Sequence, residues 1–172
     1  MNVFYLDHDT KICAEYHNDK HCVRMVLEYA QLLSTAHRII DRDMANRFVY
    51  KATHKNHPSA IWVRQNQSNY DWLYNLFVDL AEEYTYRYGR KHLSYKKLKH
   101  ILVYPPYNIE KGAFTQPTPA MPDHCKISGD SLSSYRRYYK QYKKHISKWT
   151  KRPIPTWFSG NIVESFSQNY FI

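Results

Sequence analysis

Along much of the chain, apolar residues recur every three or four positions, which is the spacing of one face of an α-helix. The longest such run predicts a helix over residues 11–40, with Asp9 or Thr10 as its N-cap. The polar side chains of this helix fall on one narrow stripe: His17, Lys20, His21, Arg24, Glu28, Gln31 and Thr35. Nearly all other positions are apolar or small, so the helix is expected to be mostly buried. The stripe is then either its one solvated edge or the lining of a cleft.

A second long helix is predicted from Pro58 to Tyr88, with Gly89 ending it. Proline suits the first helical position because its missing N–H has no partner there. Two polar side chains, Asn69 and Arg87, fall on the inward stripe of this helix. Buried amide and guanidinium groups must be hydrogen-bonded. These residues therefore either tie the helix to the first one or reach a ligand.

The remaining pattern predicts shorter elements. They are a strand or extended segment at residues 3–6, helices at 95–103 (capped by Ser94) and 131–149, a Pro-rich loop at 104–130 and an extended C-terminal tail at 150–172. Within the tail, Trp157 and Phe158 are expected to dock on the body. The sequence thus predicts a mainly α fold, a single helical domain over residues 1–172 with about four to five helices.

Charge is distributed unevenly. The net charge is +10, from 25 Lys and Arg against 15 Asp and Glu, and residues 131–152 hold eight basic and no acidic side chains. Like charges on one helix face repel, so such a face favours an anionic partner. Nucleic acid fits best, with phosphates held by Arg136, Lys140 and Lys144 and bases stacked on the abundant aromatic side chains. An anionic membrane surface or a purely solubilising role are the alternatives.

Cysteine usage and hydropathy indicate the compartment. Cys13, Cys22 and Cys125 lie far from any CxxC spacing, which favours reduced, buried thiols. No signal peptide is recognised, and no apolar run approaches the length of a transmembrane helix. A cytoplasmic protein without a membrane partner is expected.

The sequence gives little indication of a metal site or a cofactor site. His17 and His21 have the i,i+4 spacing of two zinc ligands, but the HExxH form is absent. Glu28 lies about 10 Å further along the helix axis than His21, too far to complete that site. Glycine is too scarce for a P-loop or a dinucleotide fold. No metal is expected, and the sequence names no other cofactor.

Acid–base chemistry is the stronger candidate, if the start of the second helix meets the polar stripe of the first. Side chains of the kind that transfer protons or stabilise charge are Asp19, Lys20, His21, Glu28 and His57. Side chains expected to contact the substrate are Arg24, Gln31, Asn69 and Arg87. The structural alternative is an ion-pair and hydrogen-bond network that locks the two helices together.

Several of these residues also belong to longer motifs. They are Asp19-Lys20-His21 with Arg24-Met25 and Glu28-x-Ala30-Gln31-Leu32-Leu33, then Asn56-His57-Pro58-Ser59, Glu83-Tyr84-x-x-Arg87-Tyr88-Gly89, and Pro155-x-Trp157-Phe158. Together they resemble an uncharacterised family of small proteins of tailed phages, notably T4-like phages of marine bacteria. Arg24 stands where that family has lysine, and His17 and Cys22 lie outside its pattern. The resemblance covers most of the chain and implies a viral setting without a mechanism.

The leading hypothesis is a phage-encoded enzyme that acts on nucleic acid, modifying or processing a base or nucleotide in a cleft between the first two long helices. A non-catalytic nucleic-acid-binding protein for host takeover or genome handling is the first alternative. An enzyme acting on small nucleotides is the second. The sequence specifies neither the reaction, nor DNA against RNA, nor the oligomeric state.

Overall fold

The computed structural model describes residues 1–160, and within that range the fold is mainly α, as predicted, with no strand. Its helices are α1 (Thr10–Tyr16), α2 (Asp19–Ile40), α3 (Pro58–Val63), α4 (Gln67–Tyr88), α5 (Leu93–Leu102), α6 (Ser131–Tyr142) and α7 (Thr156–Ser159). Short 3₁₀ helices lie at Arg42–Met44, Asp123–Cys125 and Lys144–Ile146. The end of the predicted tail, residues 161–172, lies outside the described residues.

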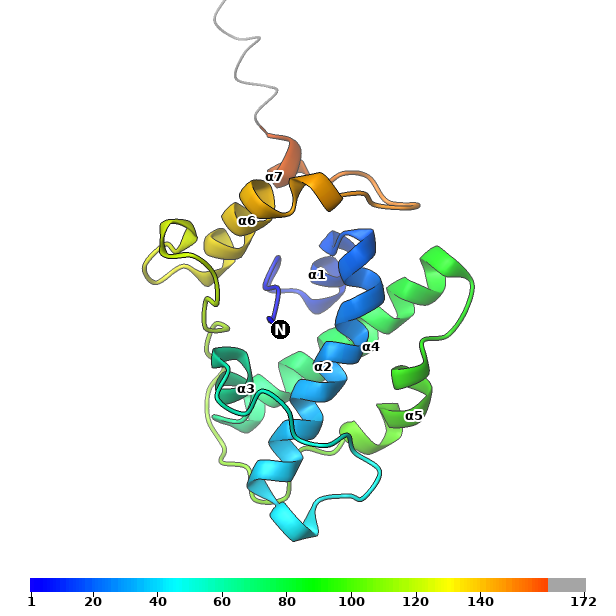
Figure 1. Ribbon diagram of the computed structural model, residues 1–172, viewed down its shortest axis with the longest axis vertical. Coiled ribbons are helices and arrows are strands. Elements are labelled where there is room, and N and C mark those ends of the chain that lie inside the picture. The colour runs from blue at the N-terminus through cyan, green and yellow to red at the C-terminus, as the bar shows by residue number, and fades with distance from the viewer. Residues whose placement is uncertain (161–172) are drawn as a thin grey trace, which may run out of the picture.

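The two long helices α2 and α4 pack against each other and form the centre of the molecule (Figure 1). α5 covers both of them on one side, and α3 packs against α2 on the other. α6 and α7 lie together beyond the N-terminal end of α2. None of the described helices is long and apolar enough to cross a membrane.

The single helix predicted over residues 11–40 is in fact two helices, which corrects that expectation. His17 ends α1, and the side chain of Asn18 accepts the backbone N–H of His21 at 2.9 Å to cap α2. The buried Arg87 donates to the backbone oxygens of Glu15 and His17, which are left without helical partners at the end of α1. The hydrophobic period continues across the break, so the period alone could not reveal it. As predicted, Asp9 caps the first helix.

The second predicted helix is also broken, between α3 and α4. Asn66 caps α4 by accepting the N–H of Asn69 at 3.0 Å. The Pro-rich loop fills the break, and a Cβ at Gly112 would lie 2.9 Å from the Cβ of Asn66, so only glycine fits there. The far end of α4 is as predicted, because Gly89 takes φ +70 and terminates it.

Two further boundaries differ from prediction. α5 begins at Leu93 with His92 as its cap, rather than after Ser94. The last predicted helix, over residues 131–149, stops at Tyr142. The chain turns there because Trp149 donates its indole N–H to the backbone oxygen of Tyr16, and tertiary bonds of this kind outweigh helix propensity. Residues 150–159 are mainly irregular but end in the short α7 rather than staying extended.

Residues 3–6 form an extended, buried segment and not a strand. Val3 and Leu6 are completely buried. The backbone N–H of Phe4 donates to the Tyr29 hydroxyl on α2, and Arg136 on α6 donates to the backbone oxygen of Leu6. This N-terminal segment therefore lies between α2 and α6.

Candidate functional site

The polar stripe of α2 faces a small pocket along part of its length. The pocket has a volume of about 180 Å³ and is lined by Met1, Asn2, Phe4, His21, Arg24, Met25, Glu28, Tyr138 and Lys143. Of the predicted site residues, the structure brings His21, Arg24 and Glu28 together here. The opposite wall is formed by the N-terminal segment and α6, whereas the sequence placed the second long helix there. We call this site the Glu28 pocket.

Glu28 lines the pocket, with its side chain 19% exposed. One carboxylate oxygen lies 3.8 Å from the α-amino nitrogen of Met1, and the other lies 3.7 Å from the guanidinium of Arg24. Arg24 itself is largely exposed. A carboxylate held between two cations, yet open to a cavity, is available both to bind a polar group and to accept a proton.

His21 contributes a neutral imidazole to the same pocket. Burial lowers its pKa to about 2, and the nearby His17 ring and the positive charges of Lys143 and Arg24 lower it further. The ring stacks on Phe4 at 4.2 Å, and its Nδ1 lies 2.6 Å from the Tyr139 hydroxyl. That hydroxyl oxygen accepts the N–H of Asn18, and Nδ1 of His21 is the one acceptor among residues 1–160 within hydrogen-bond distance of its own proton. The His21 proton is therefore on Nε2, which has no hydrogen-bond partner among residues 1–160.

His17 lies behind the pocket rather than in it. Its Nδ1–H donates to the backbone oxygen of Cys13, and its Nε2 accepts from the Tyr29 hydroxyl, each at 2.7 Å. Both ring nitrogens are thus occupied, so His17 cannot share a metal ion with His21. The described part of the chain contains no group of three His, Cys, Asp or Glu side chains that could hold a metal.

Burial of His17 predicts an acid-sensitive fold. Burial lowers the pKa of His17 from 6.5 to about 4. Between these two values His17 is protonated in the unfolded chain and neutral in the folded one. Stability is therefore lost as the pH falls through this window, by about 1.4 kcal/mol per pH unit from this residue. Urea unfolding from about pH 7 to about pH 5 measures how steeply the free energy of unfolding falls with pH. The H17Q variant should show a shallower fall. An unchanged slope in H17Q would contradict the assignment.

Asp19 and Arg87 meet in a separate, structural cluster at the junction of α1, α2 and α4. The Arg87 side chain is completely buried, with Nε 2.7 Å from Glu83 and Nη1 3.0 Å from Asp19. Asp19 also accepts the N–H and hydroxyl of Thr150. Although burial opposes ionisation, the bonds from Thr150 and Arg87 lower the pKa of Asp19. Every donor used here is satisfied within the protein, so both residues hold the fold together.

The other predicted site residues lie outside the Glu28 pocket. Asn69 bonds to Trp62 and Thr115, tying α4 to the Pro-rich loop. His57 caps α3; burial lowers its pKa, with a smaller contribution from the Met1 amino group. His57 does not line the Glu28 pocket. Lys20 is exposed and Gln31 half-buried on α2.

The basic region lies directly beside the pocket. Lys143 lines the pocket and sits over the Tyr138 ring at 4.9 Å. Lys140 is half-buried and Lys144 exposed. Arg136 differs, because it is engaged internally with the backbone oxygen of Leu6 and the carboxylate of Asp7. Lys143 is thus the side chain of this basic region that lines the Glu28 pocket, whereas Lys140 lines a separate cavity together with Arg136 and Trp157. Arg136 chiefly anchors the N-terminal segment.

Sequence reasoning missed several lining residues. Phe4, Tyr138 and the Met1 amino group were not singled out as site residues. The N-terminal segment has no helical period that could indicate its partner. The available signal was the apolar run at residues 3–6, which indicates a buried segment.

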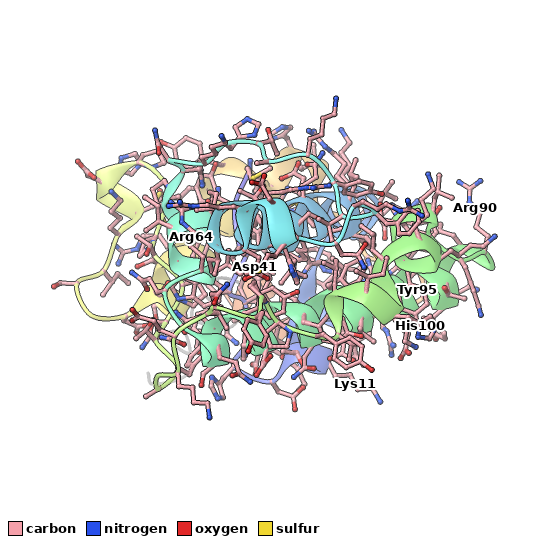
Figure 2. All side chains as sticks on the ribbon, turned by 90° about the horizontal axis from the view of Figure 1, so that it is seen from below. Lys11, Asp41, Arg64, Arg90, Tyr95 and His100 are labelled. Carbon is pink, nitrogen blue, oxygen red and sulfur yellow. The ribbon has the colours of Figure 1, made fainter. Side chains whose placement is uncertain are left out.

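A larger cavity of about 680 Å³ lies at the opposite end of α2, lined in part by His37, Asp41 and His100. Figure 2 views this end of the molecule and labels Asp41 and His100. The Asp41 carboxylate accepts the backbone N–H groups of Tyr107 and Asn108 and the Asn108 amide. Its acceptors are therefore used to fix the start of the Pro-rich loop.

Comparisons with protein-family models, with curated proteins and with solved structures find no match to this chain.

Proposed function

We propose that the protein is an enzyme that acts on nucleic acid and processes a base or nucleotide in the Glu28 pocket. The observation that carries this proposal is the meeting of a carboxylate, an amine and a neutral imidazole N–H in one cavity next to a basic surface. A carboxylate and a proton donor in one site are the elements of general acid–base catalysis. Because these groups face the cavity, they are free to meet a ligand.

The shape of the pocket favours a small reacting group. Its volume of about 180 Å³ is below the roughly 300–1,000 Å³ of typical drug-sized ligand sites. Phe4 and Tyr138 supply aromatic walls, with ring centroids 6.5 Å apart and planes within 10°. A single base or sugar taken out of a strand would fit such a site, with the flanking phosphates on the basic region.

Phage origin and a cytoplasmic setting belong to the same proposal. They rest on the resemblance of the Asp19–Leu33 motif to proteins of tailed phages. A phage enzyme of this kind would act on nucleic acid in the cytoplasm of the infected cell.

Salt-dependent binding tests the nucleic-acid partner. Replacing Lys140 and Lys144 by glutamine should weaken binding to DNA or RNA and reduce the slope of log K against log salt by roughly 0.7–0.9 per lysine, because each phosphate contact releases a counterion. Lys96 and Lys97 on α5 are exposed and provide the matched control pair. Fluorescence anisotropy with single- and double-stranded probes gives both the affinity and its dependence on salt. Equal losses from both pairs, or no binding at physiological salt, would refute the proposal.

A further inference from the structure

We propose that a cavity formed by residues of α6 and α7 binds a terminal phosphate monoester of nucleic acid. This inference rests on the proposed function, since it specifies which part of a nucleic-acid partner is recognised beside the Glu28 pocket. The two helices lie together in Figure 1. The cavity has a volume of about 310 Å³ and is lined by Ser133, Arg136, Arg137, Lys140 and Trp157. We call it the Arg137 cavity.

Four of the lining residues come from one face of α6. Their positions, 133, 136, 137 and 140, follow the i, i+3, i+4, i+7 spacing that brings side chains together along a helix. Trp157 of α7 lies beside them, with the Arg136 guanidinium 5.2 Å from the centre of its ring. The cavity is therefore surrounded by three cations and an aromatic ring, and none of its lining residues is acidic.

The protein neutralises this positive charge only in part. Arg136 pairs with the carboxylate of Asp7 at 3.1 Å. Arg137 donates from Nη1 to the backbone oxygen of His124 at 3.3 Å, which leaves its charge unpaired. Neither Arg137 nor Lys140 has a carboxylate within 4 Å in residues 1–160. Both cations are therefore available to an anionic ligand.

A terminal phosphate is the group of nucleic acid that matches this charge. A phosphate monoester carries about −1.5 to −2 charges at pH 7 and has three strong acceptor oxygens, whereas an internal phosphodiester carries a single charge. The planar guanidinium of Arg137 suits two of these oxygens, and the ammonium of Lys140 adds a point charge. The Ser133 hydroxyl already donates to Asp130 at 2.6 Å, so the two cations are the principal donors.

Trp157 favours nucleic acid over other partners that carry a phosphate. Its ring is half-buried and lies next to the cations of the cavity. Exposed aromatic rings beside positive charges are the surfaces on which the bases of single strands stack. The indole N–H of Trp157 is also buried without a hydrogen-bond acceptor among residues 1–160, and an acceptor supplied by a ligand would satisfy it.

A single strand can reach both the Arg137 cavity and the Glu28 pocket. α6 contributes Tyr138 to the Glu28 pocket and Arg137 and Lys140 to the Arg137 cavity. At about 100° per residue, Tyr138 lies on a different face of the helix from the other two, so the width of one helix, about 10–12 Å, separates the two sites. A strand whose end is held in the cavity would place nucleotides near that end at the Glu28 pocket.

Fluorescence anisotropy on strands with different ends tests the inference. One internally labelled single strand is prepared with a 5′-phosphate, a 3′-phosphate or two hydroxyl ends, and binding is measured at physiological salt. We expect one phosphorylated form to bind at least about fivefold more tightly than the hydroxyl form, the effect of an added charge-assisted contact. R137Q and, separately, K140Q should remove most of this preference. K144Q is the matched control and should weaken all three forms by the same factor, because Lys144 does not line the cavity.

The outcomes separate this inference from the proposed function. If none of the strands binds, both fail. If all three bind equally, or if R137Q and K140Q keep the preference, the terminal-phosphate site alone fails. A phosphoserine peptide that displaced the strand as well as a mononucleotide does would also overturn it, because the cavity would then recognise phosphate on proteins. Each variant is compared with its own binding of the hydroxyl form, so a partial loss of folded protein does not alter the result.

Discussion

Replacing Arg87 by methionine is expected to lower the free energy of unfolding by about 3–5 kcal/mol. The guanidinium is completely buried and donates to two carboxylates and two backbone oxygens. Methionine keeps much of the volume but leaves these acceptors without their donor. Glu83 retains Arg152, at 2.8 Å, but Asp19 loses its only ion-pair partner among the described residues. The change is severe because it removes one donor that two backbone oxygens and two carboxylates share in the interior.

Urea unfolding at neutral pH, followed by circular dichroism, measures this loss. The matched control is R90M, because Arg90 is exposed and donates to a single tyrosine hydroxyl, that of Tyr84. R90M should change stability by less than about 1 kcal/mol. If the two variants were equally stable, Arg87 would not be a structural residue, and its sequence-based assignment to substrate binding would regain support.

Arg87 and Glu28 show which features of the site can be predicted from the sequence. Helical period places Arg87 on the inward stripe of its helix, and it places Glu28 on a polar stripe that is either a solvated edge or the lining of a cleft. Helical periodicity does not tell whether a side chain faces hydrogen-bond acceptors or a cavity. Arg87 meets two carboxylates and two carbonyls, whereas Glu28 meets an amine at the edge of a pocket. Only the tertiary fold separates them.

The helix breaks were hidden for a different reason. The hydrophobic pattern runs on through His17 and Asn18, because α1 and α2 bury neighbouring faces in the same core. The break depends on Asn18 capping α2 and on a distant guanidinium that binds the freed carbonyls. Local capping residues such as Asn66 were visible in the sequence, but a buried asparagine is equally consistent with a helix interior that makes tertiary bonds.

The wall of the pocket formed by residues 3–6 could not be predicted from the sequence pattern. Residues 3–6 are too few to show a period, so the sequence allowed either a strand or an extended segment. In the structure this segment fills the space beside α2 that the sequence assigned to a cleft between two long helices. Three residues of the predicted polar stripe, His21, Arg24 and Glu28, line the pocket, and the wall that faces them is formed by the first stretch of the chain and by α6.

Replacing Glu28 by glutamine is expected to lower the rate of nucleic-acid processing by roughly 100-fold or more, which is the range for loss of a general base. Glutamine has nearly the same shape and keeps an oxygen for Arg24 and for the Met1 amine, so the fold and the pocket should persist. It cannot accept a proton from the substrate. Affinity for the oligonucleotide should stay within about twofold, because the proposed phosphate contacts of Lys140 and Lys144 do not involve Glu28.

The measurement compares product formation and binding on the same labelled oligonucleotides, containing intact, mismatched or abasic nucleotides. E82Q is the matched control, since Glu82 is exposed on α4 and faces no cavity described above. Loss of the reaction with binding retained assigns Glu28 to catalysis. If both the reaction and the binding were lost and the unfolding midpoint fell, Glu28 would instead have a structural role, through its contact with the Met1 amino group. Unchanged processing in E28Q would remove the pocket from the reaction and leave the basic region as a binding surface.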